Sequence, residues 1–203
     1  MIPEIGHFSL ILALCFALLQ SVTYGLATLL HTPILFGRTP RFAYAQFIFI
    51  LISFIALTIS FIENDFSVLY VASHSNSLLP LMYRISAVWG GHEGSLLLWM
   101  LFLSGWGLCF TLRARTTLPS HFYETVLSVL GALSAIFICF ILLTSNPFAR
   151  LLPLYPLEGQ DLNPLLQDPL LVIHPPFFIS GLCGFCYCIC GCDCVVTHYA
   201  QSQ

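Results

Sequence analysis

The sequence contains no lysine and has few charged residues of any kind. Six arginines and nine acidic residues make up the charged 7% of its 203 residues, whereas 58% are hydrophobic and the mean hydropathy is +0.92. Such a chain has too few polar side chains to coat a soluble domain, so a soluble globular protein is excluded. A net charge of −3 without any basic cluster also excludes nucleic acid as a partner. Composition therefore indicates an integral membrane protein.

The sequence contains several long runs of apolar residues. A helix needs about 20 mostly apolar residues to cross the hydrocarbon core of a bilayer. Four runs meet or approach that length, and each of them ends at polar residues or at a proline-containing segment. The sequence thus predicts an all-α, polytopic membrane protein with four transmembrane helices, a candidate fifth and two long external loops. The expected spans are 8–30, 42–62, 95–112 and 122–144, the fifth is 177–196, and the loops are 63–94 and 145–176.

The arginines predict how the chain lies across the membrane. Short cytoplasmic loops collect positive charge. Two short loops hold Arg38 with Arg41 and Arg113 with Arg115, whereas the long loops combine single arginines with most of the acidic residues. We therefore expect the N-terminus and both long loops outside. The first run lacks the basic flank and small-residue cleavage site of a signal peptide, so we expect it to be retained.

One motif stands at the start of the third span. Polar residues at such a place are costly to bury, so they usually line a cavity, bind a ligand or pair with each other. A simpler alternative is a helix start, with the carboxylate favoured by the helix dipole and the imidazole at the interface. Both interpretations stay open. The motif is Trp89-Gly90-Gly91-His92-Glu93-Gly94-Ser95.

The residues before this motif predict a short amphipathic helix. Apolar side chains at 81, 82, 85 and 88 follow Pro80 with helical spacing. This helix would lie along the membrane surface with Trp89 as an interfacial anchor. It would lead into a turn in which glycine adopts backbone angles that other residues avoid.

The second external loop combines prolines, leucines and polar residues. Its prolines are expected to exclude a long regular helix, which favours an ordered loop resting on the bilayer. His174 precedes Pro175 and Pro176 there, in a stiff and apolar frame that suits an axial haem ligand, although a histidine before two prolines is also a common turn residue. The polar loop residues are Asp161, Asn163, Gln167 and Asp168, and Pro164 stands among them.

Three motifs in this order, with the opening Met-Ile-Pro-Glu-Ile-Gly, resemble the N-terminal part of the CcmF family, the haem lyase subunit of system I cytochrome c maturation. The motifs lie at 89–99, 161–168 and 172–176, and the resemblance covers about residues 1–178.

The resemblance implies a function in cytochrome c biogenesis. It implies a membrane enzyme that takes haem from the haem chaperone CcmE and attaches it to apocytochrome c delivered by a thiol-handling chaperone. His174 matches the first of two external haem ligands, and Asp161, Asn163, Gln167 and Asp168 would shape the docking surface. The 89–95 motif, Pro164, Pro175 and Pro176 would lie near this site. The implied location is the bacterial inner membrane with the long loops periplasmic, ahead of the mitochondrial inner membrane. A related lyase dedicated to a nitrite reductase cytochrome shares the same motifs.

The family's tryptophan-rich segment, second external histidine and haem b ligands have no match within residues 1–203. The fragment alone is therefore expected to be inactive as a lyase, and a non-catalytic membrane scaffold stays an alternative. A proton- or ion-translocating subunit is a further alternative, disfavoured because the third and fourth spans hold almost no ionisable residues.

The tail from 179 to 203 departs from the family. Six of the nine cysteines lie there, at 183, 186, 188, 190, 192 and 194, where the family has an ordinary apolar span. Cysteine codons read one nucleotide later begin as valine or alanine codons, so we expect a frameshift near codon 178. A thiolate metal site is the rival interpretation, but no second half completes it and we assign no metal. The expected division is thus 1–144 for the membrane helices, 145–178 for a haem-handling loop and 179–203 for an aberrant tail.

Overall fold

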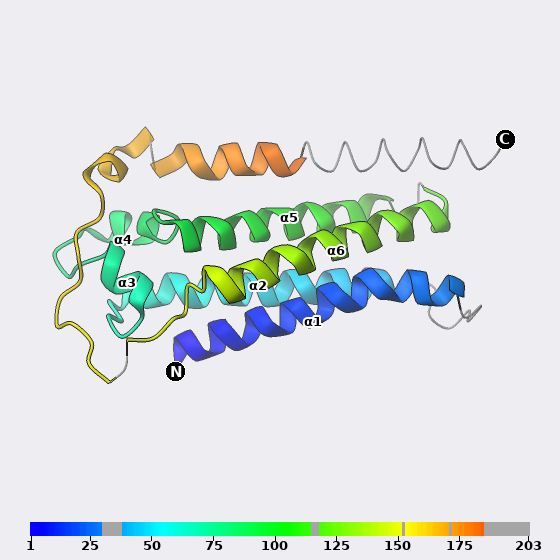
Figure 1. The fold of residues 1–203 in the computed structure, drawn as a ribbon. Helices are drawn as coiled ribbons and strands as arrows, with labels where there is room; N and C mark the ends of the chain where they lie inside the picture. Colours follow the sequence, from blue (N-terminus) through cyan, green and yellow to red (C-terminus); the bar gives the residue numbers. More distant parts are fainter. Residues whose placement is uncertain (30–37, 115–117, 152, 171, 185–203) are drawn as a thin grey trace.

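The computed structural model describes residues 1–29, 38–114, 118–151, 153–170 and 172–184. Helices follow one another along the chain, and the only pairing of extended backbone within these ranges is an isolated bridge between Val68 and Arg150. The elements are α1 (Ile2–Leu29), α2 (Thr39–Ile62), α3 (Leu69–His74), α4 (Leu81–Ala87), α5 (His92–Ala114), α6 (Ser120–Thr144), the 3₁₀ helix η1 (Pro164–Gln167) and an apolar helix at Val172–Gly184 (Figure 1).

The four predicted spans are confirmed as α1, α2, α5 and α6, each of which is long and apolar enough to cross a membrane. At 1.5 Å per residue, 24 helical residues extend about 36 Å, which exceeds the hydrocarbon thickness. Every span begins a few residues before its apolar run, because polar residues and prolines fit the first turn of a helix. Pro40, for example, occupies the first turn of α2, where its missing N–H leaves no carbonyl without a donor.

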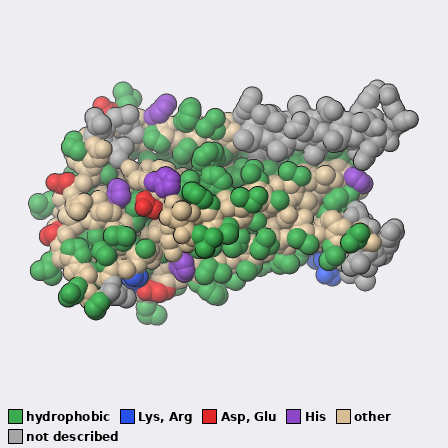
Figure 2. Space-filling model, in the orientation of Figure 1, with side chains coloured by type: hydrophobic (Ala, Val, Ile, Leu, Met, Phe, Trp, Pro, Cys, Tyr) green, Lys and Arg blue, Asp and Glu red, His purple; other side chains and the backbone are tan. Residues whose placement is uncertain are grey.

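The four long helices pack as a bundle in which α1 contacts α2 and α6, and α5 contacts the same two helices. Gly131 lets α6 approach α1 closely, since a Cβ there would lie 2.8 Å from the backbone nitrogen of Ser21. Buried Gln20 donates its side-chain N–H to the Leu127 carbonyl oxygen at 2.7 Å, which joins the same two helices. Charged side chains gather at the two ends of the face shown in Figure 2, and hydrophobic ones cover the length between them.

One end of the bundle carries all the long connections. The start of α1, the end of α2, the start of α5 and the end of α6 meet there, together with α3 and α4 (Figure 1). The predicted short helix after Pro80 is confirmed as α4. Helix α3 was not predicted; it forms because Tyr70, Val71 and Ala72 are buried against the bundle, a tertiary effect that local sequence does not reveal. We call this the outer end.

The chain after η1 corrects one prediction. Prolines were expected to exclude a long helix at 164–176, yet residues 169–170 and 172–184 are helical. Asp168 starts this helix, because its carboxylate accepts the Leu170 N–H at 2.8 Å and its carbonyl oxygen accepts the Val172 N–H at 3.0 Å. His174, Pro175 and Pro176 therefore lie on a helix and not in a loop. The expected fifth span is described only as far as residue 184, and its remainder lies outside the described residues.

Candidate functional site

The turn between α4 and α5 is organised around one buried hydroxyl. Tyr70 is 3% exposed, and its hydroxyl donates to the Val88 carbonyl oxygen and accepts the Gly91 N–H, both at 3.0 Å. Burial raises the pKa of the Tyr70 phenol above its ordinary value, so the group stays protonated and able to donate. Ser95 completes the turn by donating to the Trp89 carbonyl oxygen at 2.7 Å.

Gly91 and Gly94 of the motif are required by space. A Cβ on Gly94 would overlap the Val88 carbonyl oxygen and lie 2.7 Å from the Tyr70 hydroxyl. A Cβ on Gly91 would lie 2.6 Å from Nε2 of His74 and 2.7 Å from the Tyr70 ring. The expected reason, unusual backbone angles, is wrong for Gly91, whose φ lies outside the left-handed region. Close packing of α3 against the turn is the reason instead.

His92 and Glu93 open α5, as the helix-start interpretation expects. The His92 side chain is paired through Nδ1 with the hydroxyl of Ser145 at 3.2 Å, which joins the start of α5 to the end of α6. Glu93 lies in the first turn, where the helix dipole favours a carboxylate. Gly90, which follows Trp89 in the turn, is half-buried. The contact with Ser145 gives His92 a bracing position; a direct part of His92 or Glu93 in binding stays a prediction.

The second segment that was predicted to be external contacts α3 and the residues that follow it. Asp161 accepts a hydrogen bond from the Asn76 side chain, and Glu158 accepts one from the Ser77 hydroxyl at 2.7 Å. The Gln160 N–H donates to the Ala72 carbonyl oxygen at 2.7 Å. The two predicted external segments are thus joined to each other directly.

The polar residues of this second segment differ in exposure. Asp161, Asn163, Pro164 and Asp168 are exposed, whereas Gln167 is half-buried and donates to the Leu162 carbonyl oxygen at 3.2 Å. Asn163 precedes η1, Pro164 is its first residue, and Asp168 leads into the next helix. Gln167 therefore braces the loop, and the exposed residues form its outer surface.

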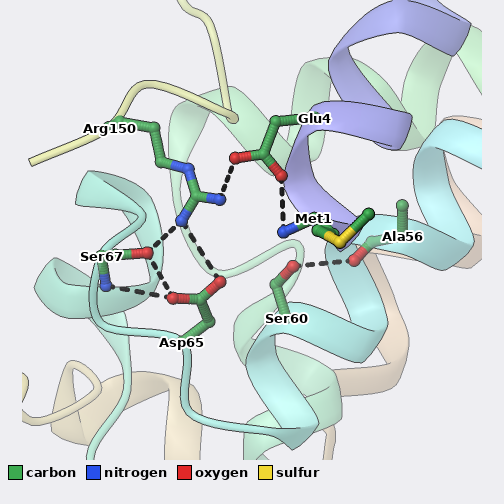
Figure 3. A network of polar contacts seen from close by, with 7 residues as sticks. All are labelled: Met1, Glu4, Ala56, Ser60, Asp65, Ser67 and Arg150. Atoms are coloured by element: carbon green, nitrogen blue, oxygen red, sulfur yellow. Dashed lines mark hydrogen bonds and ion pairs between the residues drawn. The ribbon is translucent and has the colours of Figure 1, made fainter.

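An ion network that the sequence did not indicate ties the same end together (Figure 3). The Arg150 guanidinium contacts Glu4 on α1 and the Ser67 hydroxyl, and lies 3.4 Å from the Asp65 carboxylate. The terminal amine of Met1 pairs with Glu4 at 2.7 Å. Hydrogen bonds of 2.8 Å from Leu69 to Ala149 and from Leu151 to Ser67 run beside it. The network fixes the residues after α2 and after α6 to the start of α1.

His174 contrasts with these paired groups. Its side chain is exposed, and its ring stacks on Phe178 one turn later with the ring centroids 5.7 Å apart. Leu170, Ile173 and Phe177 lie on the same side of the helix and are 78%, 50% and 75% exposed. The helix thus presents an imidazole in the middle of an uncovered apolar stripe.

The helix that carries His174 lies along α5 (Figure 1). Nε1 of Trp89 donates to the Val172 carbonyl oxygen at 3.0 Å, and Nε1 of Trp106 donates to the Ser180 carbonyl oxygen at 3.1 Å. The structure therefore brings the 89–95 motif and the His174 helix into contact through Trp89. The histidine of that motif, His92, bonds elsewhere, to Ser145.

Metal chemistry has little support in the part of the chain that the structure describes. No group of three or more His, Cys, Asp or Glu side chains gathers there. Cys183 is buried, and its thiol lies 3.9 Å from the Trp99 carbonyl oxygen. The other five tail cysteines lie outside the described residues, so the metal-site and frameshift hypotheses for the tail stay predictions.

Comparison with known proteins places the sequence among cytochrome maturation factors. The family model described as cytochrome C assembly protein matches residues 89–199, more than half of the chain. The cytochrome c-type biogenesis proteins CcmF of Pseudomonas aeruginosa and Escherichia coli are 49% identical over 185 residues and 46% identical over 187 residues. Each alignment covers 91% of this chain but 28% of the relative, so the chain spans less than a third of their length.

A solved structure gives the same result for the fold. The protein described as cytochrome c heme lyase CcmF superposes with a TM-score of 0.76 at 26% identity, over 91% of this chain and 28% of that one. The family-model match covers residues 89–199 and therefore extends past residue 178, where the frameshift is expected.

Proposed function

Because the chain belongs to the cytochrome c assembly protein family, we propose that it forms the haem-handling outer face of a CcmF-type haem lyase in cytochrome c biogenesis. The observation that carries the proposal is the exposed His174 on an apolar helix at the end of the bundle where all the long connections meet. In this proposal the four long helices anchor that face in the membrane.

The residues around His174 suit haem as the cargo. Neutral imidazole is a common axial ligand for haem iron. The exposed side chains of Leu170, Ile173 and Phe177 offer an apolar surface for a porphyrin, whose burial there would remove hydrophobic area from water. The stack on Phe178 holds the imidazole ring in one orientation before a ligand arrives.

The reaction itself needs little covalent participation by the protein. Each cysteine thiol of an apocytochrome adds across one haem vinyl group, so that sulfur bonds to one vinyl carbon and the thiol proton ends on the other. No electron leaves or enters the reactants in this addition. The contribution of this chain is to hold the haem through His174 beside the docking surface of Asp161, Asn163 and Asp168, which raises the effective concentration of the reacting groups.

The partners and location follow from the same proposal. The haem chaperone CcmE would deliver haem to His174, and a thiol-handling chaperone would present the apocytochrome at the exposed loop. The outer end would then face the periplasm and the bundle would lie in the bacterial inner membrane. This orientation agrees with Arg38, Arg41 and Arg113 on the opposite side, where positive charge favours the cytoplasm.

An ion-translocating role has weaker support. The buried polar side chains between the helices are mostly amides and hydroxyls, such as Gln20, Gln46, Ser104 and Ser134. Such groups do not titrate near neutral pH, so they provide no relay for protons. Glu124 is buried as well, but it lies near the start of α6, away from the middle of the bundle.

A chimera tests the proposal. Residues 1–178 would replace the aligned segment of Escherichia coli CcmF in a strain that lacks its own copy, and covalent haem on a c-type cytochrome would be measured by haem-dependent peroxidase staining. We expect the chimera to restore cytochrome c and His174→Ala to reduce it to the level of the empty strain. His92→Ala is the matched control, because it removes an external imidazole that is already paired.

Normal cytochrome c levels with His174→Ala, in a chimera that reaches its usual abundance in the membrane, would contradict the proposal. A second chimera that retains residues 179–203 tests the tail. If the tail is out of frame, only the shorter chimera should restore cytochrome c.

A further inference from the structure

The helix that carries His174 contains a backbone defect. Each N–H in an α-helix donates to the carbonyl four residues earlier, and proline has no N–H to donate. Pro176 therefore leaves the Val172 carbonyl oxygen without its helical donor. A buried carbonyl without a donor is costly, so such a group needs a substitute.

The substitute comes from the 89–95 motif. Nε1 of Trp89 donates to this same Val172 carbonyl oxygen at 3.0 Å. The indole N–H thus occupies the place of the backbone donor that Pro176 cannot supply. Val172 is 8% exposed, so the contact is made on the covered side of the helix. His174 follows two residues later and is exposed.

Trp89 is itself fixed to the bundle. Its backbone N–H donates to the Ser86 carbonyl oxygen at 3.2 Å, and its backbone carbonyl oxygen accepts a hydrogen bond from the Ser95 hydroxyl at 2.7 Å. Its ring packs against the main hydrophobic core. Tyr70 holds the residues on both sides through its bonds to the backbone at 88 and 91. Because the backbone and the ring of Trp89 are both held, its indole N–H can fix the position of the helix to which it donates.

We propose that Trp89 is a positioning residue for His174: its indole N–H replaces the donor missing at Pro176 and fixes the register and rotation of the helix that presents the imidazole. The proposal rests on the proposed role of His174 as a haem ligand. Trp89 acts through the helix and does not itself contact haem.

Trp106 provides a matched control within the same chain. Its indole N–H donates to the Ser180 carbonyl oxygen on the same helix at 3.1 Å. The residue four positions after Ser180 is Gly184, which has its own N–H. Trp106 therefore adds a contact without replacing a missing donor, and its effect should not depend on residue 176.

A double-mutant cycle tests the substitution. Trp89→Phe removes the N–H and keeps an aromatic ring, and Pro176→Ala restores a backbone donor for Val172. Amide hydrogen exchange over residues 172–184 would be measured by mass spectrometry on the whole chain in detergent, without haem. We expect Trp89→Phe to speed exchange roughly fivefold when Pro176 is present, as the loss of one hydrogen bond predicts, and less than about twofold in the Pro176→Ala background.

Trp106→Phe should change exchange equally in both backgrounds. Equal effects of Trp89→Phe in the native and Pro176→Ala backgrounds, or no effect in either, would overturn the proposal. Should Trp89→Phe fail to accumulate in the membrane, Pro176→Ala is expected to restore its abundance, and failure to do so would equally count against the proposal.

Haem titration of the same variants, followed by absorbance, separates this proposal from the proposed function. Weaker haem binding is expected for His174→Ala and, to a smaller degree, for Trp89→Phe, with recovery when Trp89→Phe is combined with Pro176→Ala. If His174→Ala weakens binding and Trp89→Phe does not, positioning by Trp89 is wrong and the function stands. If His174→Ala leaves binding unchanged, the proposed function is wrong, while the exchange cycle still decides whether Trp89 replaces the missing donor.

Discussion

The outer end of the molecule carries two histidine-bearing segments that are built in opposite ways. In the turn at 88–95, hydroxyls of Tyr70, Ser95 and Ser145 engage the motif, and His92 is paired. In the helix at 172–184, His174 is exposed within an apolar stripe. A dense polar motif can therefore mark internal bracing. Both imidazoles are exposed, but His92 is paired with the Ser145 hydroxyl, whereas His174 stacks on Phe178 within the apolar stripe.

The largest expected effect comes from breaking the braced turn. Gly94→Ala forces a Cβ against the Val88 carbonyl oxygen, a backbone atom that cannot move without opening the turn. We expect a loss of about 3 kcal/mol or more of folding free energy, measured as thermal stability in detergent. Gly181→Ala is the control in the other segment, because nothing lies within 4 Å of its Cβ position. Equal stability of the two variants would contradict the contrast between the segments.

The second effect concerns the ion network at the outer end. Arg150→Leu removes the cation that joins Glu4, Asp65 and Ser67. Because the Arg150 side chain is only 22% exposed, we expect a loss of roughly 2 kcal/mol, between the values for surface and buried pairs. Arg150→Lys keeps the positive charge but not the planar guanidinium with its several N–H donors, so it should recover part of the lost stability. Thermal stability measured at low and high salt checks this, and full stability of Arg150→Leu would show that the network is dispensable.

A smaller effect is expected from the hydroxyl at the centre of the turn. Tyr70→Phe removes the acceptor for the Gly91 N–H and the donor for Val88, which should cost about 1 kcal/mol or slightly more. Burial raises the folded-state pKa of Tyr70 above its unfolded value near 10. Its contribution is therefore complete below about pH 10 and is lost as pH rises toward the folded-state pKa.

The difference in stability between the native chain and Tyr70→Phe should thus shrink when thermal unfolding is followed from about pH 9 to about pH 11, across the ordinary tyrosine pKa. A difference that stays constant over this range would mean that Tyr70 ionises equally in the folded and unfolded chains.

The smallest effect is expected at the exposed loop. Asp161→Asn weakens the contact with Asn76 at a solvent-exposed site, so stability should change by about 0.5 kcal/mol or less. In the chimera, the same substitution should lower cytochrome c assembly without lowering protein abundance, because Asp161 is proposed to lie on the docking surface. A parallel fall in abundance would assign Asp161 to bracing instead.

Much of the fold could be predicted from the sequence, because a bilayer imposes a length and an apolar composition that are directly readable. The spans now seen as α1, α2, α5 and α6 follow from that constraint, and α4 follows from its spacing after Pro80. Helix α3 could not be predicted, since its stability comes from burial of Tyr70 against distant parts of the chain.

The arrangement of the predicted site residues could not be predicted from the sequence. Prolines in the second segment suggested a loop, yet Asp168 caps a helix and Trp89 supplies a donor that Pro176 lacks. Both compensations come from particular side-chain contacts, one of them across 83 residues of sequence. The Arg150 network was missed for the same reason, since its members lie far apart along the chain.

The most direct test of the account is a haem titration of the purified chain that compares His174→Ala with His92→Ala by absorption spectroscopy. We expect His174→Ala to lose the spectrum of imidazole-ligated haem and His92→Ala to keep it. The reverse result, loss with His92→Ala and retention with His174→Ala, would place the ligand in the braced motif and contradict the account.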